Sequence, residues 1–258
     1  MNNIIIEDQK CSIEVDDTIG FEQIEAYILK LNIHVKKDTI ISLKEQGEIK
    51  VDMTIRVDPH TQVIMKCQDE SIKRKVQYHY FLSEGSSLAI ERVSCSKESK
   101  SLEIVELNGY GASFNTVQRT IMMGKQRMDI VAYHNAKKTT SNIENRGVTL
   151  EDGSGYWNVT GMVYPGMTEC VINQKNHIIN LNNKTSRINP NLLIEENNVT
   201  ANHSAYIGTF DEDIFFYLET RGIPRDKALS LLVEGFLTEG SMEEEIKERI
   251  KLILGGEK

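Results

Sequence analysis

The residues in this sequence that could hold a metal or transfer a proton are few and widely spaced. The four cysteines are Cys11, Cys67, Cys95 and Cys170, and no two of them form a C-x-x-C pair. Their spacing matches no zinc or metal-cluster signature, so each thiol is most simply interpreted as a small buried side chain. Walker A, GxSxG and HExxH motifs are also absent. The sequence therefore carries no signature of these common enzyme classes.

One histidine stands out by its position in a strand-like pattern. Between Val199 and Ile207 the apolar residues fall on every second position, which is the period of a β-strand. His203 shares this phase with Ala201 and Ala205. On the sequence alone, a lone histidine in this phase is expected to be a hydrogen-bonded core residue, and a functional histidine is the alternative.

The composition limits the classes of protein that this chain can represent. A length of 258 residues suits one large domain with an appendage, and 40% hydrophobic and 26% charged residues are typical of soluble globular proteins. The net charge of −8 disfavours a protein that coats nucleic acid. No apolar run approaches the roughly 18 residues that a membrane helix needs, and the N-terminal MNNIIIEDQK does not resemble a signal peptide. We therefore expect a cytoplasmic protein that contacts neither nucleic acid nor membrane.

The candidate residues must be positioned by short strands that dominate residues 33 to 208. Val51, Met53, Ile55 and Val57 alternate strictly with polar residues, and Gly, Pro and Asn-rich turn signals separate many similar runs. An antiparallel sandwich or barrel and a solenoid both fit this pattern. No linker divides the region, which favours a solenoid in which each coil buries its face on the next, although no clean repeat period is visible. Residues 1 to 32 are expected to be a short, partly helical segment, with a helix at 20 to 30.

Residues 209 to 258 are predicted to form a small helical domain of three helices. The first runs from about Asp211 to Thr220 with Gly222 as its C-terminal cap, and the second begins at Pro224 and ends near Leu237. The third follows Ser241, which forms a capping box with the glutamate three residues later. The second helix is apolar on most of its sides, which indicates either full burial or a docking surface for another protein.

The order of residues from 198 to 236 resembles the SufD/SufB family of iron–sulfur cluster assembly scaffolds. The resemblance rests on NVTANHSAYIG, then FFYLETRGIP, then an alanine and an LLVEGF run. It covers about the last quarter of the chain strongly. It implies an all-β fold with an α C-terminal appendage, namely a right-handed parallel β-helix followed by a small helical domain.

The resemblance also implies roles for particular residues. It places His203 at the position that family members use in cluster assembly, at the interface with a partner subunit, and neutral imidazole is a suitable ligand for iron. SufB-type chains carry a cysteine one strand earlier, where this chain has Asn173–His177 without one, and glutamates where it has Asn202 and Ser204. These departures favour the SufD side, with Cys170 and His177 as weaker candidates for a ligand role.

The partners that the resemblance implies are a SufC-type ABC ATPase and a SufB-like subunit or a second copy of the chain. A transient iron–sulfur cluster or iron would then be held at the partner interface, and the chain itself would not be an enzyme. Aromatic residues and arginine are common in binding hot spots, so the expected ATPase contacts are Phe215, Phe216, Tyr217, Arg221 and Phe236. The alternatives are a cytosolic β-solenoid enzyme that modifies acyl groups or sugars, and a purely structural interaction module.

Overall fold

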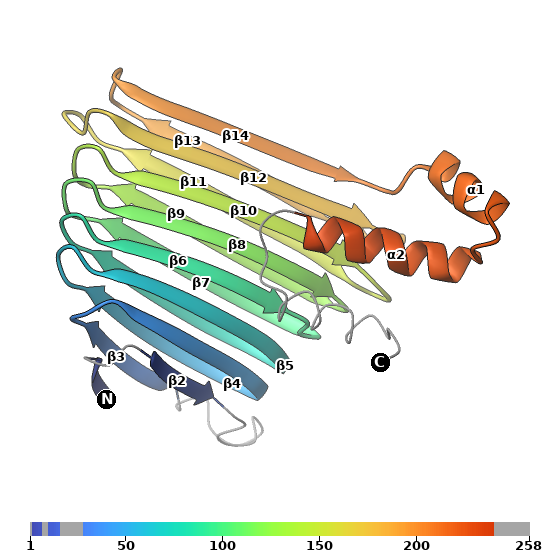
Figure 1. Ribbon diagram of the computed structural model, residues 1–258, viewed down its shortest axis with the longest axis horizontal. Helices are drawn as coiled ribbons and strands as arrows, with labels where there is room; N and C mark the ends of the chain where they lie inside the picture. The colour runs from blue at the N-terminus through green and yellow to red at the C-terminus, as the bar shows by residue number, and fades with distance from the viewer. Residues whose placement is uncertain (1, 7–9, 16–27, 240–258) are drawn as a thin grey trace.

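The computed structural model describes residues 2–6, 10–15 and 28–239 of the chain (Figure 1). The helix expected after Ser241 lies outside these residues, as does most of the helix expected at 20 to 30. Leu29 and Lys30 belong instead to a strand. Asn2–Ile6 and Lys10–Val15 are also strands, and they pair with the third and fourth strands of the chain.

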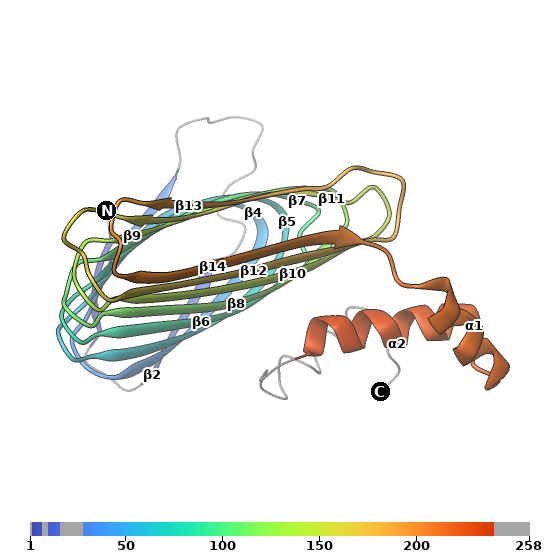
Figure 2. The same ribbon diagram turned by 90° about the horizontal axis from the view of Figure 1, so that it is seen from above.

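In the described residues, fourteen strands form one continuous parallel sheet that winds into a solenoid, and this confirms the predicted fold class. The coils follow one another in the right-handed sense, as Figures 1 and 2 show. Every strand pair is parallel, which excludes the antiparallel sandwich for the described residues. The strands are β1 Asn2–Ile6, β2 Lys10–Val15, β3 Leu29–Val35, β4 Thr39–Val57, β5 Gln62–Leu82, β6 Ser87–Ser94, β7 Glu98–Leu107, β8 Ser113–Met122, β9 Lys125–His134, β10 Thr140–Thr149, β11 Ser154–Val163, β12 Cys170–Asn180, β13 Arg187–Ile194 and β14 Val199–Gly208.

The solenoid has two long faces that lie opposite each other (Figure 2). One face is the series β6-β8-β10-β12-β14 and the other is the series β7-β9-β11-β13, joined through β5. The two early coils are unbroken, because β4 and β5 each continue from one face into the other. β4 bends where the register shifts between Gly47 and Glu48, and the φ of 72° at Gly47 suits a residue without a Cβ.

The coils lengthen steadily along the second face. In the strand register, Lys75 lies opposite Lys100, and Lys100 lies opposite Arg127. Further along, Arg127 lies opposite Tyr156, and Tyr156 lies opposite Arg187. Each of these steps is longer in sequence than the one before it. This drift explains why the sequence shows no fixed repeat period.

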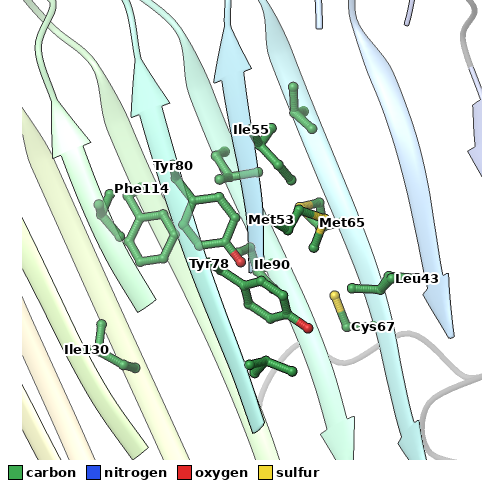
Figure 3. Packing of buried hydrophobic residues seen from close by; sticks show 14 of the residues in the cluster. Leu43, Met53, Ile55, Met65, Cys67, Tyr78, Tyr80, Ile90, Phe114 and Ile130 are labelled. Carbon is green, nitrogen blue, oxygen red and sulfur yellow. The ribbon is translucent and has the colours of Figure 1, made fainter. Parts of the chain in front are cut away.

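The interior of the solenoid is filled by alternate residues from both faces. Its main apolar cluster runs from Leu31 to Ile178, and Figure 3 shows part of it, with the rings of Tyr80 and Phe114 stacked 6.0 Å apart. One layer of the interior is charged. Arg74 and Arg92 both pair with Glu45, at 3.0 and 3.1 Å, and these three side chains are almost fully buried. Buried charges of this kind persist only when they are paired and hydrogen-bonded.

Among the residues that the structure describes, two helices follow the solenoid, close to the boundaries predicted for the first two of three. α1 spans Glu212–Thr220, and the Asp211 carboxylate caps it by accepting from the Asp213 N–H. α2 spans Arg225–Thr238 and lies outside the β8-β10-β12 face, where Val233 and Leu237 pack on Ile121, Val148 and Ile179 (Figures 1 and 2). Within the described part of the chain, neither helix is long and apolar enough to cross a membrane.

Candidate functional site

The last coil leaves one long strand edge without a partner. Among the described residues, β14 pairs only with β12, and β13 pairs only with β11. The backbone groups on the outer side of β14 therefore have no strand to bond with, and an edge of this kind is a ready template for another chain.

His203 lies in the middle of this edge strand. It occupies the inward-facing phase, as expected, but its side chain is exposed because no further described coil covers the interior at this point. In the neighbouring coil it lies opposite the buried Gln174. The Gln174 amide donates to the Asn191 carbonyl at 3.3 Å, while its Oε1 has no hydrogen-bond partner among the described residues. The interpretation of His203 as a buried core histidine is therefore wrong.

Cys170 is a fully buried free thiol at the start of β12. Its Sγ lies 3.2 Å from both the Thr139 Oγ1 and the Met167 carbonyl oxygen. These contacts close the thiol off within a turn region that precedes the strand. Because Cys170 lies opposite Val199, four residues before His203, the two sites are separated by about 13 Å along the strand direction.

His177 lies on the outer surface of the same strand, under the second helix. Its ring makes edge-on contacts with Tyr206 at 4.5 Å and Phe236 at 4.8 Å. Burial, together with the nearby Arg146 guanidinium, lowers the pKa of His177. The neutral ring is thus an element of the contact between α2 and the solenoid.

The three candidate ligands do not converge on one point. Cys170 and His203 face the interior, His177 faces outward, and His177 lies opposite Tyr206, three residues beyond His203. Within the described ranges, no group of three or more His, Cys, Asp or Glu residues is arranged to hold a metal ion.

The aromatic residues of α1 divide into an exposed pair and a buried member. The side chains of Phe216 and Tyr217 are 70% and 56% exposed, and the Arg221 guanidinium lies 5.2 Å from the Tyr217 ring centre. Ile214 and Leu231 are also exposed, on α1 and α2. Phe216, Tyr217 and Arg221 lie toward one side of α1 and are referred to below as the helical face.

Phe215 and Phe236 have a different environment from the helical face. Phe215 is buried against Phe210, and the Arg225 guanidinium lies over its ring at 4.4 Å. The Phe236 ring contacts His177 and has the Arg146 guanidinium 5.5 Å from its centre. Both rings therefore anchor the helices to one another and to the solenoid.

Two arginines that no sequence motif marks hold the C-terminal end of α2. Arg119 of β8 donates to the Leu237 carbonyl at 2.8 Å, and Arg146 of β10 donates to the Phe236 carbonyl at 3.0 Å. Arg146 also pairs with Glu239, and this hydrogen bond lowers the pKa of the Glu239 carboxyl. Cations at a helix C-terminus complement the dipole and satisfy its last carbonyls. A sequence signal for this role is lacking, because both arginines are isolated cations in polar strands.

Comparison with a family model gives a match that covers most of the solenoid and both helices. The family model described as "SUF system FeS cluster assembly, SufBD core domain" matches residues 61–236. The chain is 30% identical over 135 residues to the iron–sulfur cluster assembly protein SufD of Bacillus subtilis, an alignment that covers 50% of this chain and 31% of that protein. It is 45% identical over 51 residues to an iron–sulfur cluster assembly SufBD family protein of Mycobacterium tuberculosis, covering 19% of this chain and 13% of that protein. The chain thus matches less than a third of the length of each of these relatives.

Proposed function

Because the chain belongs to the SufBD family of SUF iron–sulfur cluster assembly proteins, we propose that it is a scaffold subunit of such a system. In this proposal the outer edge of β14 pairs with a SufB-like subunit or with a second copy of the chain. The helical face binds a SufC-type ABC ATPase. The observation that carries the proposal is the last coil, whose edge strand bears the exposed His203 and has no second strand partner among the described residues.

Pairing at β14 is supported by the chemistry of that edge. An added strand would satisfy the outer backbone groups of β14 and extend a sheet that is already parallel throughout its described part. His203 would then lie at the junction of two subunits, beside the unpartnered Oε1 of Gln174. A transient cluster, or iron, is the cargo in this scheme, and the partner supplies the further ligands.

Binding of the ATPase is supported by the helical face. Phe216 is 70% exposed, and the neighbouring Tyr217 is 56% exposed with the Arg221 guanidinium over its ring. Aromatic residues and arginine in such contacts are typical of interface hot spots. In the proposed mechanism, ATP binding draws two attached ATPases together. The paired scaffolds are strained as a result, and the site between their edge strands opens in the cytoplasm. The chain itself hydrolyses nothing.

The first test of the proposal concerns His203. We expect His203→Ala to lower cluster assembly in cells by roughly tenfold or more, the scale on which removal of a group that orients a metal ligand acts. Subunit pairing, measured by size-exclusion chromatography, should persist. Ser204→Ala, at the neighbouring exposed position of the same strand, is the control and should assemble clusters normally. Equal activity of the two variants would remove His203 from the proposed site.

The second test concerns the helical face. Phe216→Glu should weaken co-purification of the ATPase by about 30-fold or more, because a hot-spot residue contributes at least about 2 kcal/mol. The thermal unfolding temperature should not change, since the side chain is largely exposed. Phe216→Leu, which keeps the apolar character, is the matched control. Retention of the ATPase by the glutamate variant would assign this surface another role.

A further inference from the structure

A row of cationic side chains crosses the outside of the second face of the solenoid. In the strand register, Lys50 lies opposite Lys75, Lys75 opposite Lys100, and Lys100 opposite Arg127. The row continues through Tyr156 to Arg187 on β13. Neighbouring parallel strands are about 4.8 Å apart, so this cationic ladder extends over about 24 Å. The chain as a whole has a net charge of −8, so this row of positive charge contrasts with an acidic molecule.

The cationic ladder lowers the stability of the solenoid. Like charges directly opposite each other on adjacent strands destabilise a sheet. Arg127 is neutralised in part by Asp129, at 2.7 Å. Lys75, Lys100 and Arg187 form no ion pair with any described residue, and all three are exposed. The arrangement thus leaves positive charge that the described part of the fold does not use.

The ladder lies in a hollow rather than on a flat surface. A cavity of about 710 Å³ is lined by the ladder together with Lys73, Lys125 and the neutral side chains of Ser154 and Thr185. Glu98 is the one acidic residue among the described lining residues, and it lies 4.0 Å from Lys73. A volume of this size is typical of small-molecule sites, and a cleft lined by one sign of charge concentrates the opposite ion.

We propose that this hollow binds a small anion that carries two or more phosphate groups, of the inorganic polyphosphate or nucleoside polyphosphate class. Each phosphate has several acceptor oxygens, so one group can contact two adjacent rungs of the ladder. The Arg127 guanidinium, which lies 5.0 Å from the Tyr156 ring centre, forms a planar surface beside the phosphates. This site is independent of β14 and of the helical face.

The spacing of the ladder favours this ligand over an acidic peptide. Side chains on one side of an extended peptide repeat about every 6.8 Å, so successive carboxylates would fall out of step with rungs about 4.8 Å apart. The overall charge of −8 opposes the approach of a long nucleic acid. A short anion with dense charge meets neither difficulty.

Isothermal titration of the full chain with inorganic tripolyphosphate tests the proposal. Binding is expected at low salt. Its affinity should fall as the salt concentration rises from about 50 to about 200 mM, because contacts between cations and phosphates are weakened by salt. The double variant Lys75→Glu/Lys100→Glu should lose at least about tenfold in affinity, since each 1.4 kcal/mol is a factor of ten. Lys37→Glu/Lys137→Glu makes the same change in net charge at exposed turns and should bind as the parent does.

The following outcomes support or overturn the proposal. Loss of binding in the ladder variant but not in the turn variant supports the site. ATP titrated in parallel distinguishes the source: equal affinity assigns recognition to the phosphates, and tighter binding adds the nucleoside. Equal loss in both double variants, or no heat with tripolyphosphate, would overturn the proposal. Tighter binding of an oligo-deoxythymidine or an acidic peptide would also overturn it. None of these outcomes bears on ATPase binding or cluster assembly. The anion-site proposal and the proposed scaffold function can therefore fail separately.

Discussion

At the scale of single residues, His134 gives the solenoid a defined response to acid. Its ring is fully buried at the end of β9, where Nδ1 lies 2.8 Å from the Thr139 hydroxyl and Nε2 lies 2.9 Å from the Ser141 hydroxyl. Burial lowers the pKa of His134 from 6.5 to about 4. The ring is therefore neutral in the folded protein at pH values where the unfolded chain already binds a proton.

This difference predicts how stability changes with pH. Below pH 6.5 the unfolded state takes up the proton that the native state refuses, so stability should fall as the pH drops from 6.5 to about 4. The contribution of His134 is about 3 kcal/mol over that window. Urea unfolding of the parent and of His134→Asn across pH 4 to 7 measures it. The variant should show a shallower decline, and parallel curves would contradict the prediction.

Some residues in the interior could not be assigned from the sequence. Glu45, Arg74 and Arg92 are the residue types most often found on surfaces, and alternation alone does not reveal that they share one buried layer. Their pairing joins strands up to 47 positions apart, a relation that no local pattern contains. For His203 the sequence predicts one property and not another. The alternation predicts that His203 faces inward, but its exposure depends on the absence of a covering coil among the described residues.

At the scale of elements, the sequence pattern predicts some strands and not others, for physical reasons. Runs rich in valine and isoleucine, such as Val51 to Val57, were recognised. β10 is not predicted from the sequence, because Ser141 and Asn145 stand on either side of the inward-facing Ile143 and break the apolar alternation. β13 was missed because Pro190 interrupts it, yet proline is tolerated there since β13 lies at the edge of the sheet.

The attachment of α2 yields a prediction at the same scale. Arg146 bonds the Phe236 carbonyl and lies over the Phe236 ring, so Arg146→Met should loosen the C-terminal end of the helix. Loss of a hydrogen bond from a charged group costs about 1.5–3 kcal/mol. Amide hydrogen exchange should therefore quicken in α2 and remain unchanged in β7 and β9. Arg127→Met, which removes an exposed arginine far from the helix, is the control. Unaltered exchange in α2 would show that apolar packing alone holds it.

At the scale of the whole molecule, order is expected to decrease toward the last coil. In β14 no residue is fully buried, whereas every second residue of β7 and β9 is. Solenoids unfold through their nearest-neighbour contacts, so a coil with one neighbour opens most easily. Amide exchange in the isolated protein should be fastest in β13 and β14. It should slow in β14 when the proposed partner is added. Strong protection of β14 in a verified monomer would contradict this expectation.

The gradual increase in coil length has a consequence for self-assembly. Each step along the second face is longer in sequence than the last, from Lys75 opposite Lys100 to Tyr156 opposite Arg187, although β7, β9 and β11 all have ten residues. Most of the added residues therefore lie in the turns, which are longer in the later coils than in the earlier ones. Identical blunt ends could stack head to tail into an open-ended fibre, as heterologous contacts do when the rotation fails to close. Coils whose turns differ in length do not match in outline, so this solenoid cannot repeat that contact without a mismatch at the turns. The difference in turn length therefore disfavours an open-ended fibre.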